Sequence, residues 1–178
     1  MEIERLYNLT ASQYDKRYKQ LQIDKIKFIL NKLNTNLKNK KILDLGAGTG
    51  FLERFLLNKK LITKNQDIIF IDISQNMLKI AKQKLRGCKF KYLTLDLEKS
   101  LKIKERFDII FSITVLQNIT KSKRKFFLKQ IKNHLNKDGI AVITTLNKDI
   151  TQKEFSELLK TFKTSRVYKF SEDLIAIA

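Results

Sequence analysis

The chain has 178 residues, 43% of them hydrophobic, and carries 37 Lys and Arg against 18 Asp and Glu, a formal net charge of +19. This length suits one globular domain that buries roughly 70% of its unfolded surface, and no apolar run approaches the ~20 residues of a membrane span. The single Cys88 and the single His134 exclude an internal disulfide framework and a zinc site, so we expect a cytoplasmic protein without a metal.

The first helical pattern follows a segment rich in tyrosine. Tyr7, Tyr14 and Tyr18 lie within the first 20 residues, where no periodic pattern stands out. Apolar residues then recur with a helical period and predict a helix over residues 21–33. They are Ile23, Ile26, Ile29, Leu30 and Leu33.

Residues 42–50, Ile-Leu-Asp-Leu-Gly-Ala-Gly-Thr-Gly, are the most informative stretch. The apolar residues up to Asp44 end a predicted buried strand, and three alternating glycines then form a tight turn. Apolar residues at helical spacing follow from Phe51 to Leu56. Glycines let a ligand approach the backbone, and a helix N-terminus offers free N–H groups, so this corner is typical of a binding site.

The rest of the chain alternates between helical and strand patterns. Strands are predicted near 41–45, 67–71, 89–95, 107–113 and 139–145, and helices near 50–58, 74–86, 122–136 and 151–162. The turn at 136–139 should separate the last of these strands from the helix before it. Residues 165–170 and 174–178 are too close for a crossover and must pair antiparallel. We therefore predict an α/β fold in a single domain (1–178): one doubly wound, mostly parallel seven-stranded sheet with helices on both faces and a C-terminal antiparallel hairpin.

Acidic residues follow the second and third predicted strands. Asp72 ends the second strand, 22 residues beyond Gly50, close to the spacing at which nucleotide-binding α/β folds place a ribose-binding carboxylate. The alternative is a helix N-cap, but Ser74 can fill that role. Asp96, which ends the third strand, is either a ligand-binding acid or an ordinary turn residue.

The glycine pattern separates two nucleotide-binding families. It is Gly-x-Gly-x-Gly after an acid, and the third glycine of the dinucleotide fingerprint would fall at Phe51 or Glu53. The chain from about residue 40 to 178 thus resembles the class I S-adenosylmethionine-dependent methyltransferases, whose first motif is Asp-x-Gly-x-Gly-x-Gly. A nicotinamide oxidoreductase is disfavoured by the missing glycine and by the C-terminal hairpin.

The resemblance implies S-adenosylmethionine as the cofactor and assigns roles around it. Asp44 would hold the methionine end, Asp72 the ribose and Asp96 the adenine. Ile73 and Met77 would flank the adenine ring, although they suit the core equally well. Further predicted cofactor contacts are Gly46, Ala47, Gly48, Gly50, Leu97, Ser112 and, on an N-terminal flap over residues 1–20, Tyr14. The alternative for this flap is a surface helix whose aromatic side chains pack on the domain.

The segment after the fourth predicted strand faces the transferred methyl in the resembled family. Here it provides Thr114, Gln117 and Asn118, our candidate catalytic residues, and no histidine that could act as a general base. The chain has no proline, so it lacks the Asn-Pro-Pro-Tyr signature used for exocyclic or amide nitrogens, which argues against adenine-N6 and glutamine-amide methylation.

The positive charge favours a polyanionic partner. Lys121, Lys123, Arg124 and Lys125 follow the candidate catalytic segment and predict binding of RNA (tRNA or rRNA) or a ribosomal particle. The alternatives are a solvated lysine face on a small-molecule methyltransferase, and a non-catalytic nucleic-acid-binding protein. A chain this short also suggests an activating partner protein.

Overall fold

The structure is a computed structural model that describes residues 19–178, so Tyr14 and the rest of the predicted flap up to residue 18 lie outside it. The strands are β1 (Ile42–Leu45), β2 (Ile68–Asp72), β3 (Lys91–Thr94), β4 (Phe107–Ser112), β5 (Leu135–Leu146), β6 (Arg166–Phe170) and β7 (Asp173–Ile177). A helix over residues 19–33 precedes β1, and the later helices are α2 (Phe51–Asn58), α3 (Gln75–Lys84), α4 (Arg124–His134) and α5 (Gln152–Leu159). Single-turn helices form at Leu116–Asn118 and Lys121–Lys123.

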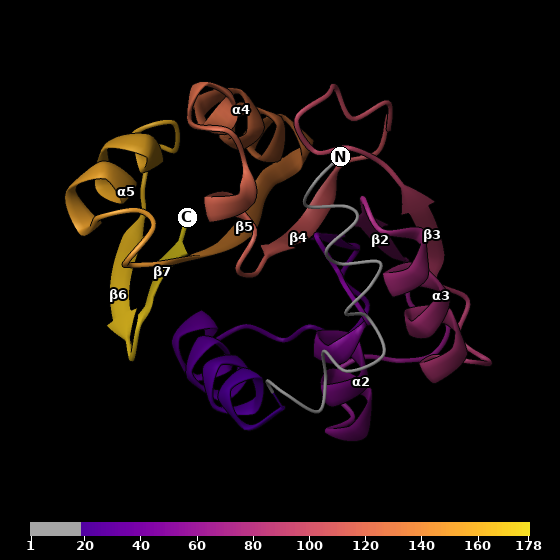
Figure 1. The fold of residues 1–178 in the computed structure, drawn as a ribbon. Helices are drawn as coiled ribbons and strands as arrows, with labels where there is room; N and C mark the ends of the chain where they lie inside the picture. Colours follow the sequence, from indigo (N-terminus) through magenta and orange to yellow (C-terminus); the bar gives the residue numbers. More distant parts are fainter. Residues whose placement is uncertain (1–18) are drawn as a thin grey trace.

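The seven strands form one sheet in the order β3-β2-β1-β4-β5-β7-β6 (Figure 1). The first five strands in this order are mutually parallel, whereas β7 is antiparallel to both β5 and β6. The predicted mixed sheet and its C-terminal hairpin are therefore confirmed. Because β1 lies beside β2 on one side and β4 on the other, the strand order reverses there, which is where α/β sheets place their ligands.

Alternation of side chains along the strands builds two cores. Leu43 and Leu45 of β1 point into the core that α4 and α5 cover, while Ile42 points into the core under residues 19–33, α2 and α3. Figure 1 shows these two helix groups on opposite faces of the sheet. Asp44 shares the parity of Ile42 and therefore faces the α2 side.

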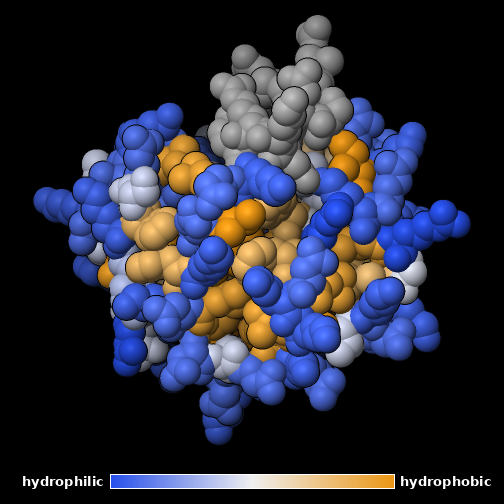
Figure 2. All heavy atoms as spheres, turned by 90° about the horizontal axis from the view of Figure 1, so that it is seen from below, coloured by the Kyte–Doolittle hydropathy of each residue, from blue (hydrophilic) through white to orange (hydrophobic). Residues whose placement is uncertain are grey.

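The face that carries residues 19–33 and α2 keeps some apolar surface. Figure 2 shows apolar side chains in the middle of this face within a surround of hydrophilic ones. Its half-buried apolar residues include Phe28, Phe51, Phe55 and Leu57. In the described part of the chain, no helix has the length and apolar character needed to cross a membrane.

The predicted turn at 136–139 does not separate a helix from a strand. Helix α4 ends at His134 and β5 begins at once, with Leu135 opposite Phe107 and Ile140 opposite Ile109, so residues 136–139 bulge out of the ladder. Asn136 donates a hydrogen bond from Nδ2 to Asp108 Oδ1 at 2.8 Å and anchors the bulge on β4. This long-range contact replaces the local turn that the Asn-Lys-Asp-Gly sequence favours.

Candidate active site

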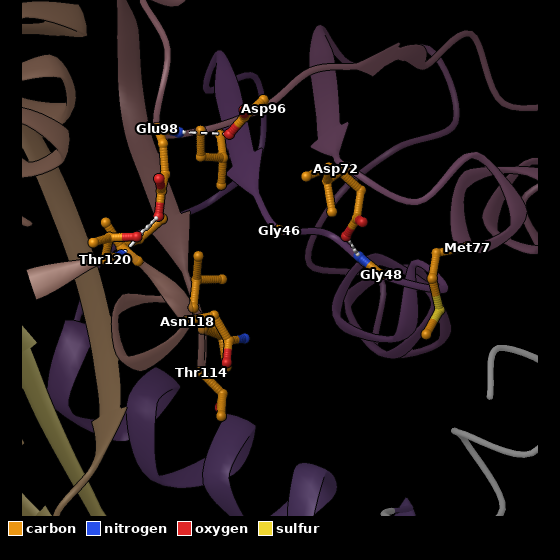
Figure 3. Close-up of a pocket in the computed structure, with 14 residues that line it drawn as sticks. Gly46, Gly48, Asp72, Met77, Asp96, Glu98, Thr114, Asn118 and Thr120 are labelled. Atoms are coloured by element: carbon orange, nitrogen blue, oxygen red, sulfur yellow. Dashed lines mark hydrogen bonds between the residues drawn. The ribbon is translucent and has the colours of Figure 1, made fainter. Parts of the chain in front are cut away.

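A cavity of about 350 Å³ opens at the carboxyl ends of β1, β2 and β4. Its lining includes the predicted residues Gly46, Gly48, Asp72, Ile73, Met77, Asp96, Leu97, Thr114 and Asn118. Figure 3 shows Asp72 and Gly48 on one side of this cavity, and Thr114, Asn118 and Thr120 across from them. Segments far apart in sequence thus converge on one site at the point where the strand order reverses.

Hydrogen bonds to β2 hold the glycine-rich loop after β1. The N–H groups of Gly46 and Ala47 both donate to the carbonyl oxygen of Ile71, at 2.7 and 3.0 Å. A Cβ at Gly46 would lie 2.3 Å from Val115 Cγ2, so only glycine fits there. Gly48 has a φ of +53°, and a Cβ built on it would meet nothing within 4 Å. The backbone at Gly48 is therefore open to the cavity, as a ligand that lies against the loop requires.

The Asp72 carboxylate is oriented by the backbone. Oδ2 accepts a hydrogen bond from the N–H of Gly48 and Oδ1 accepts one from the N–H of Ser74, both at 2.8 Å. Burial raises the pKa of Asp72, and these N–H groups partly offset that rise. Ser74 caps α3, accepting from the N–H of Met77, as predicted. Each Asp72 oxygen keeps a lone pair, so the carboxylate can still accept the two hydroxyl hydrogens of a ribose.

Asp44 lies in a second, smaller cavity on the α2 side of the same loop. This cavity measures about 60 Å³ and is lined by Asp44, Gly46, Ala47 and Gly48, and by Gln22 from the helix over residues 19–33. Asp44 is 4% exposed, and burial raises its pKa to about 7. The predicted methionine-end and ribose-end residues thus lie on opposite sides of the loop, in cavities that share Gly46 and Gly48.

The residues predicted to contact the adenine line the cavity and also contribute to the packing of the fold. Met77 is 1% exposed and Leu97 is 7% exposed, although both contribute to the lining. Asp96 Oδ1 accepts a hydrogen bond from the N–H of Glu98 at 2.9 Å, and Oδ2 lies 3.5 Å from the Lys99 ammonium. Asp96 therefore both shapes a turn and borders the cavity. Gly50 lies outside both linings, caps α2 at a φ of +69°, and packs against α3.

Thr114 holds an unusual backbone conformation at the cavity wall. Its φ is +60°, which is rare for a β-branched residue. Its N–H donates to Thr144 Oγ1 at 2.8 Å, its hydroxyl accepts from Lys25 Nζ at 2.9 Å, and its carbonyl accepts from Gln117 Nε2 at 2.7 Å. Contacts of this kind hold a residue in an unfavourable backbone conformation, and residues in such conformations are often found at functional sites.

Besides Gly50, two predicted site residues line neither cavity, Gln117 and Ser112. Gln117 instead bridges the Thr114 carbonyl and the Thr145 hydroxyl, which donates to Gln117 Oε1 at 3.2 Å. Ser112 is fully buried, and its hydroxyl makes no hydrogen bond to any residue between 19 and 178. Gln117 is therefore placed to support Thr114, and Ser112 is a core residue of β4.

Sequence reasoning missed Glu98 and Thr120, which also line the cavity. Glu98 Oε1 accepts hydrogen bonds from both the N–H and the hydroxyl of Thr120, each at 2.7 Å, and so ties the loop after β3 to the loop after β4 (Figure 3). The position of Glu98, two residues after Asp96 and close to the end of a strand, could have identified it from the sequence. Within residues 19–178 no group of His, Cys, Asp or Glu side chains is arranged to hold a metal ion.

The predicted basic surface is smaller than expected. Lys121, Lys123 and Lys125 are exposed, but Arg124 is only 9% exposed. Its guanidinium donates to Glu154 Oε1 at 2.9 Å and to the Ile119 carbonyl at 3.2 Å. The expectation of an RNA-facing Arg124 is therefore wrong, because this cation is used to join α4 to α5.

Comparisons with known proteins agree with this geometry. The sequence profile of the family described as "Methyltransferase domain" matches residues 42–139. The chain is 32% identical over 122 residues to the ubiquinone biosynthesis O-methyltransferase of Pelagibacter ubique, a match that covers 67% of this chain and 48% of that protein. It is 26% identical over 170 residues to the malonyl-[acyl-carrier protein] O-methyltransferase of Bacillus anthracis, covering 94% and 59%. The chain therefore spans about half the length of these curated relatives.

Solved structures share the fold. The complex of DhpI with S-adenosylhomocysteine superposes with a TM-score of 0.78 at 18% identity, covering 98% of this chain and 93% of that one. A TehB-like methyltransferase from Corynebacterium glutamicum gives 0.70 at 20% identity, covering 94% and 96%. With the family match, the intact glycine loop and the converging acids, these likenesses show that the chain belongs to the class I S-adenosylmethionine-dependent methyltransferases.

Proposed function

We propose that this methyltransferase acts on a small acceptor that is neutral or cationic. The observation that carries the proposal is the charge of the larger cavity. Asp72, Asp96 and Glu98 belong to its lining, and none of the lining residues that the structure describes is Lys or Arg. Phosphates near this opening would be repelled, whereas a hydroxyl or amine would not. The names of the two curated relatives, which refer to O-methylation in ubiquinone biosynthesis and of a malonyl-carrier protein, also favour an acceptor other than RNA.

The two cavities together fit the cofactor on three counts. The open backbone at Gly48 gives room beside the loop, Asp72 offers two oriented acceptor oxygens, and Asp44 offers a carboxylate for a cationic end. When bound, S-adenosylmethionine supplies a methyl group activated by its sulfonium. We infer that Asp44, Asp72 and Asp96 hold the amino-acid, ribose and adenine parts.

The acceptor would meet Thr114 and Asn118, which line the cavity across from Asp72 (Figure 3). The Thr114 hydroxyl and the Asn118 amide can hydrogen-bond a neutral nucleophile and orient it in line with the activated methyl. The protein contributes chiefly proximity and orientation, which for an already activated donor supply several kcal/mol, up to about 10 kcal/mol. The methylated oxygen or nitrogen must lose its proton, and without a histidine in the described lining we expect an acceptor acidic or basic enough to need little help.

Transfer of a labelled methyl group tests this proposal. The protein would be incubated with methyl-labelled S-adenosylmethionine and either a protein-free small-molecule extract or purified tRNA and rRNA. We expect label in the small-molecule fraction, and much less of it with Asp72→Ala at a limiting cofactor concentration, whereas the exposed Asp138→Asn variant should behave as wild type. Label in RNA alone would overturn the proposal.

RNA remains a second candidate because Lys121, Lys123 and Lys125 are exposed directly after the cavity residue Thr120. If these lysines bind phosphates, RNA affinity should fall with salt, with a slope of about −0.7 to −0.9 per phosphate contact. Replacement of all three by Gln should then flatten that slope. A slope unchanged by the triple variant would assign these lysines to a solvated face.

A further inference from the structure

Glu53 is a buried carboxyl that the site described above does not use. It lies in the first turn of α2, next to Leu52 and one turn from Leu56, and these three form the buried side of the helix. Glu53 itself is 0% exposed. A charged carboxylate in such a place is costly, so the group either finds a partner or stays neutral.

The partner is Asp44. Asp44 points to the α2 face of the sheet, and its carboxyl and the backbone N–H of Glu53 itself are the polar neighbours of the Glu53 carboxyl. Neither Glu53 oxygen forms a well-aligned hydrogen bond with a donor in the described part of the chain. Two carboxyls that meet in a buried space are stable when one of them carries a proton.

The order of ionisation follows from the surroundings. Burial and the nearby Asp44 charge raise the pKa of Glu53 well above its usual value. Burial raises the pKa of Asp44 to about 7, and the neighbouring Glu53 carboxyl opposes that rise because it can offer its proton to Asp44. Asp44 therefore ionises first, while Glu53 keeps its proton and can donate it in a hydrogen bond.

The other titratable groups around the pair are also acidic. Asp72 from β2 adds to the rise in the pKa of Asp44. Burial raises the pKa of Tyr92 on β3 to about 12, and the charges of Cys88 and Glu53 add to that rise. From the helix over residues 19–33, the uncharged side chains of Gln22 and Ile26 line the small cavity beside Asp44. A positive charge that entered this cavity would meet an acidic environment.

We propose that Glu53 is a positioning residue for the cofactor: its carboxyl stays protonated and donates a hydrogen bond to the Asp44 carboxylate, which faces the cationic amino-acid end of S-adenosylmethionine. The proposal rests on the cofactor site described above. One O–H bond changes during binding. Where Asp44 is still protonated, the cationic end of the ligand displaces that proton to solvent. Cofactor affinity should therefore weaken as pH falls below about 7, by up to about tenfold per pH unit.

Calorimetric titration of wild type, Glu53→Gln and Glu53→Met between about pH 6 and pH 8.5 tests this assignment. Two ligands are compared: S-adenosylmethionine, and 5′-methylthioadenosine, which lacks the amino-acid end. Gln keeps a donor for Asp44, so Glu53→Gln should follow wild type. Met has similar size and no donor, so it should raise the pKa of Asp44. If that rise is about one unit, Glu53→Met should bind S-adenosylmethionine about tenfold more weakly at pH 6 and nearly normally at pH 8.5.

The outcomes distinguish a wrong role for Glu53 from a wrong cofactor site. Binding of 5′-methylthioadenosine should be equal in all folded variants and independent of pH, and wild type should release a proton with S-adenosylmethionine alone at pH 6. If Glu53→Met folds and follows wild type at every pH, or if Glu53→Gln loses as much as Glu53→Met, the role of Glu53 is refuted. If Glu53→Met does not fold, wild-type affinity without pH dependence refutes it as well. If folded wild type binds neither ligand, the cofactor site itself is wrong.

Discussion

At the scale of single residues, the backbone fixes the direction of the Asp72 carboxylate. Its two oxygens accept N–H donors from Gly48, in the glycine loop, and from Ser74, at the start of α3. The carboxylate therefore has its final direction before any ligand arrives, and it holds the loop against β2. Binding of a ribose then costs little ordering of this residue, which is a general source of affinity in preorganised sites.

Asp72→Ala should weaken binding of S-adenosylhomocysteine by roughly ten- to a hundredfold, the range expected when hydrogen bonds to a charged group are lost. The variant should also melt at a lower temperature, because two buried N–H groups lose their acceptors. Calorimetry and thermal unfolding measure the two effects. Asp138→Asn, on an exposed position, is the matched control. Affinity within twofold of wild type would contradict the ribose assignment.

At the scale of elements, a buried ion pair connects the first described helix to the sheet. Lys25 Nζ lies 2.7 Å from Asp173 Oδ1 at the start of β7, and both side chains are at most 2% exposed. The same ammonium donates to the Thr114 hydroxyl. The helix over residues 19–33, the C-terminal hairpin and the cavity wall therefore share one cation, which helps to hold Thr114 in its left-handed conformation.

Lys25→Met should destabilise the fold by about 3–5 kcal/mol, since it leaves the Asp173 carboxyl buried without its partner. The double variant Lys25→Met, Asp173→Leu should recover much of this loss. Urea unfolding of the two single variants and the double variant measures the coupling. The exposed pair of Lys160 and Glu157 is the control, and Lys160→Met should cause no measurable change. Additive effects of the two buried substitutions would show that the pair does not act as a unit.

The sequence predicted the elements well wherever the pattern is local. Strand β1, the glycine turn and α2 follow one another within 17 residues, and the residue types dictate each step. Asp72 was found from its spacing beyond the glycine turn, and Asp96 was found from the resemblance to the methyltransferase family. The bulge at 136–139 was missed because its anchor, Asp108, lies on a different strand.

Buried titratable side chains were the other feature that the sequence analysis did not predict. Lys25, Glu53 and Arg124 all fall in helical segments, where a charged residue normally faces solvent. Each of them is buried beside a partner on another element: Lys25 beside Asp173, Glu53 beside Asp44, and Arg124 beside Glu154. Gln117 was misplaced for the same reason, since Thr145 on β5 draws its amide away from the cavity. A single sequence does not reveal such pairings, because they depend on the final packing of the sheet.

At the scale of the whole molecule, charge is distributed unevenly. The chain carries +19 overall, yet three carboxyl groups are buried around the cofactor site, those of Asp44, Glu53 and Asp72. Burial raises the pKa of each of them. We expect these carboxyls to favour a ligand with a cationic end and hydroxyl groups, and their burial destabilises the ligand-free fold when they are charged.

The raised pKa values of these buried carboxyls predict how the stability of the ligand-free protein varies with pH. A carboxyl whose pKa is raised by folding binds its proton more tightly in the folded state, so its contribution to stability falls as pH rises from its unfolded pKa to its folded one. For Asp44 this window runs from 3.8 to about 7. The melting temperature of the ligand-free protein should therefore be several degrees lower at about pH 7.5 than at about pH 5.5. Carboxyls with lowered pKa, such as Asp108, act in the opposite sense only at more acidic pH.

Asp44→Asn isolates the origin of this slope. Asn carries no charge at any pH, so the variant should melt higher than wild type at about pH 7.5 and match it more closely at about pH 5.5. Asp138→Asn should leave the wild-type slope unchanged, since that residue is exposed. At one fixed concentration, S-adenosylhomocysteine should raise the melting temperature of the wild type more than that of Asp44→Asn, because the variant binds it more weakly. If the wild-type melting temperature rises with pH across this window, and Asp44→Asn shows the same rise, the buried Asp44 carboxylate does not destabilise the ligand-free fold.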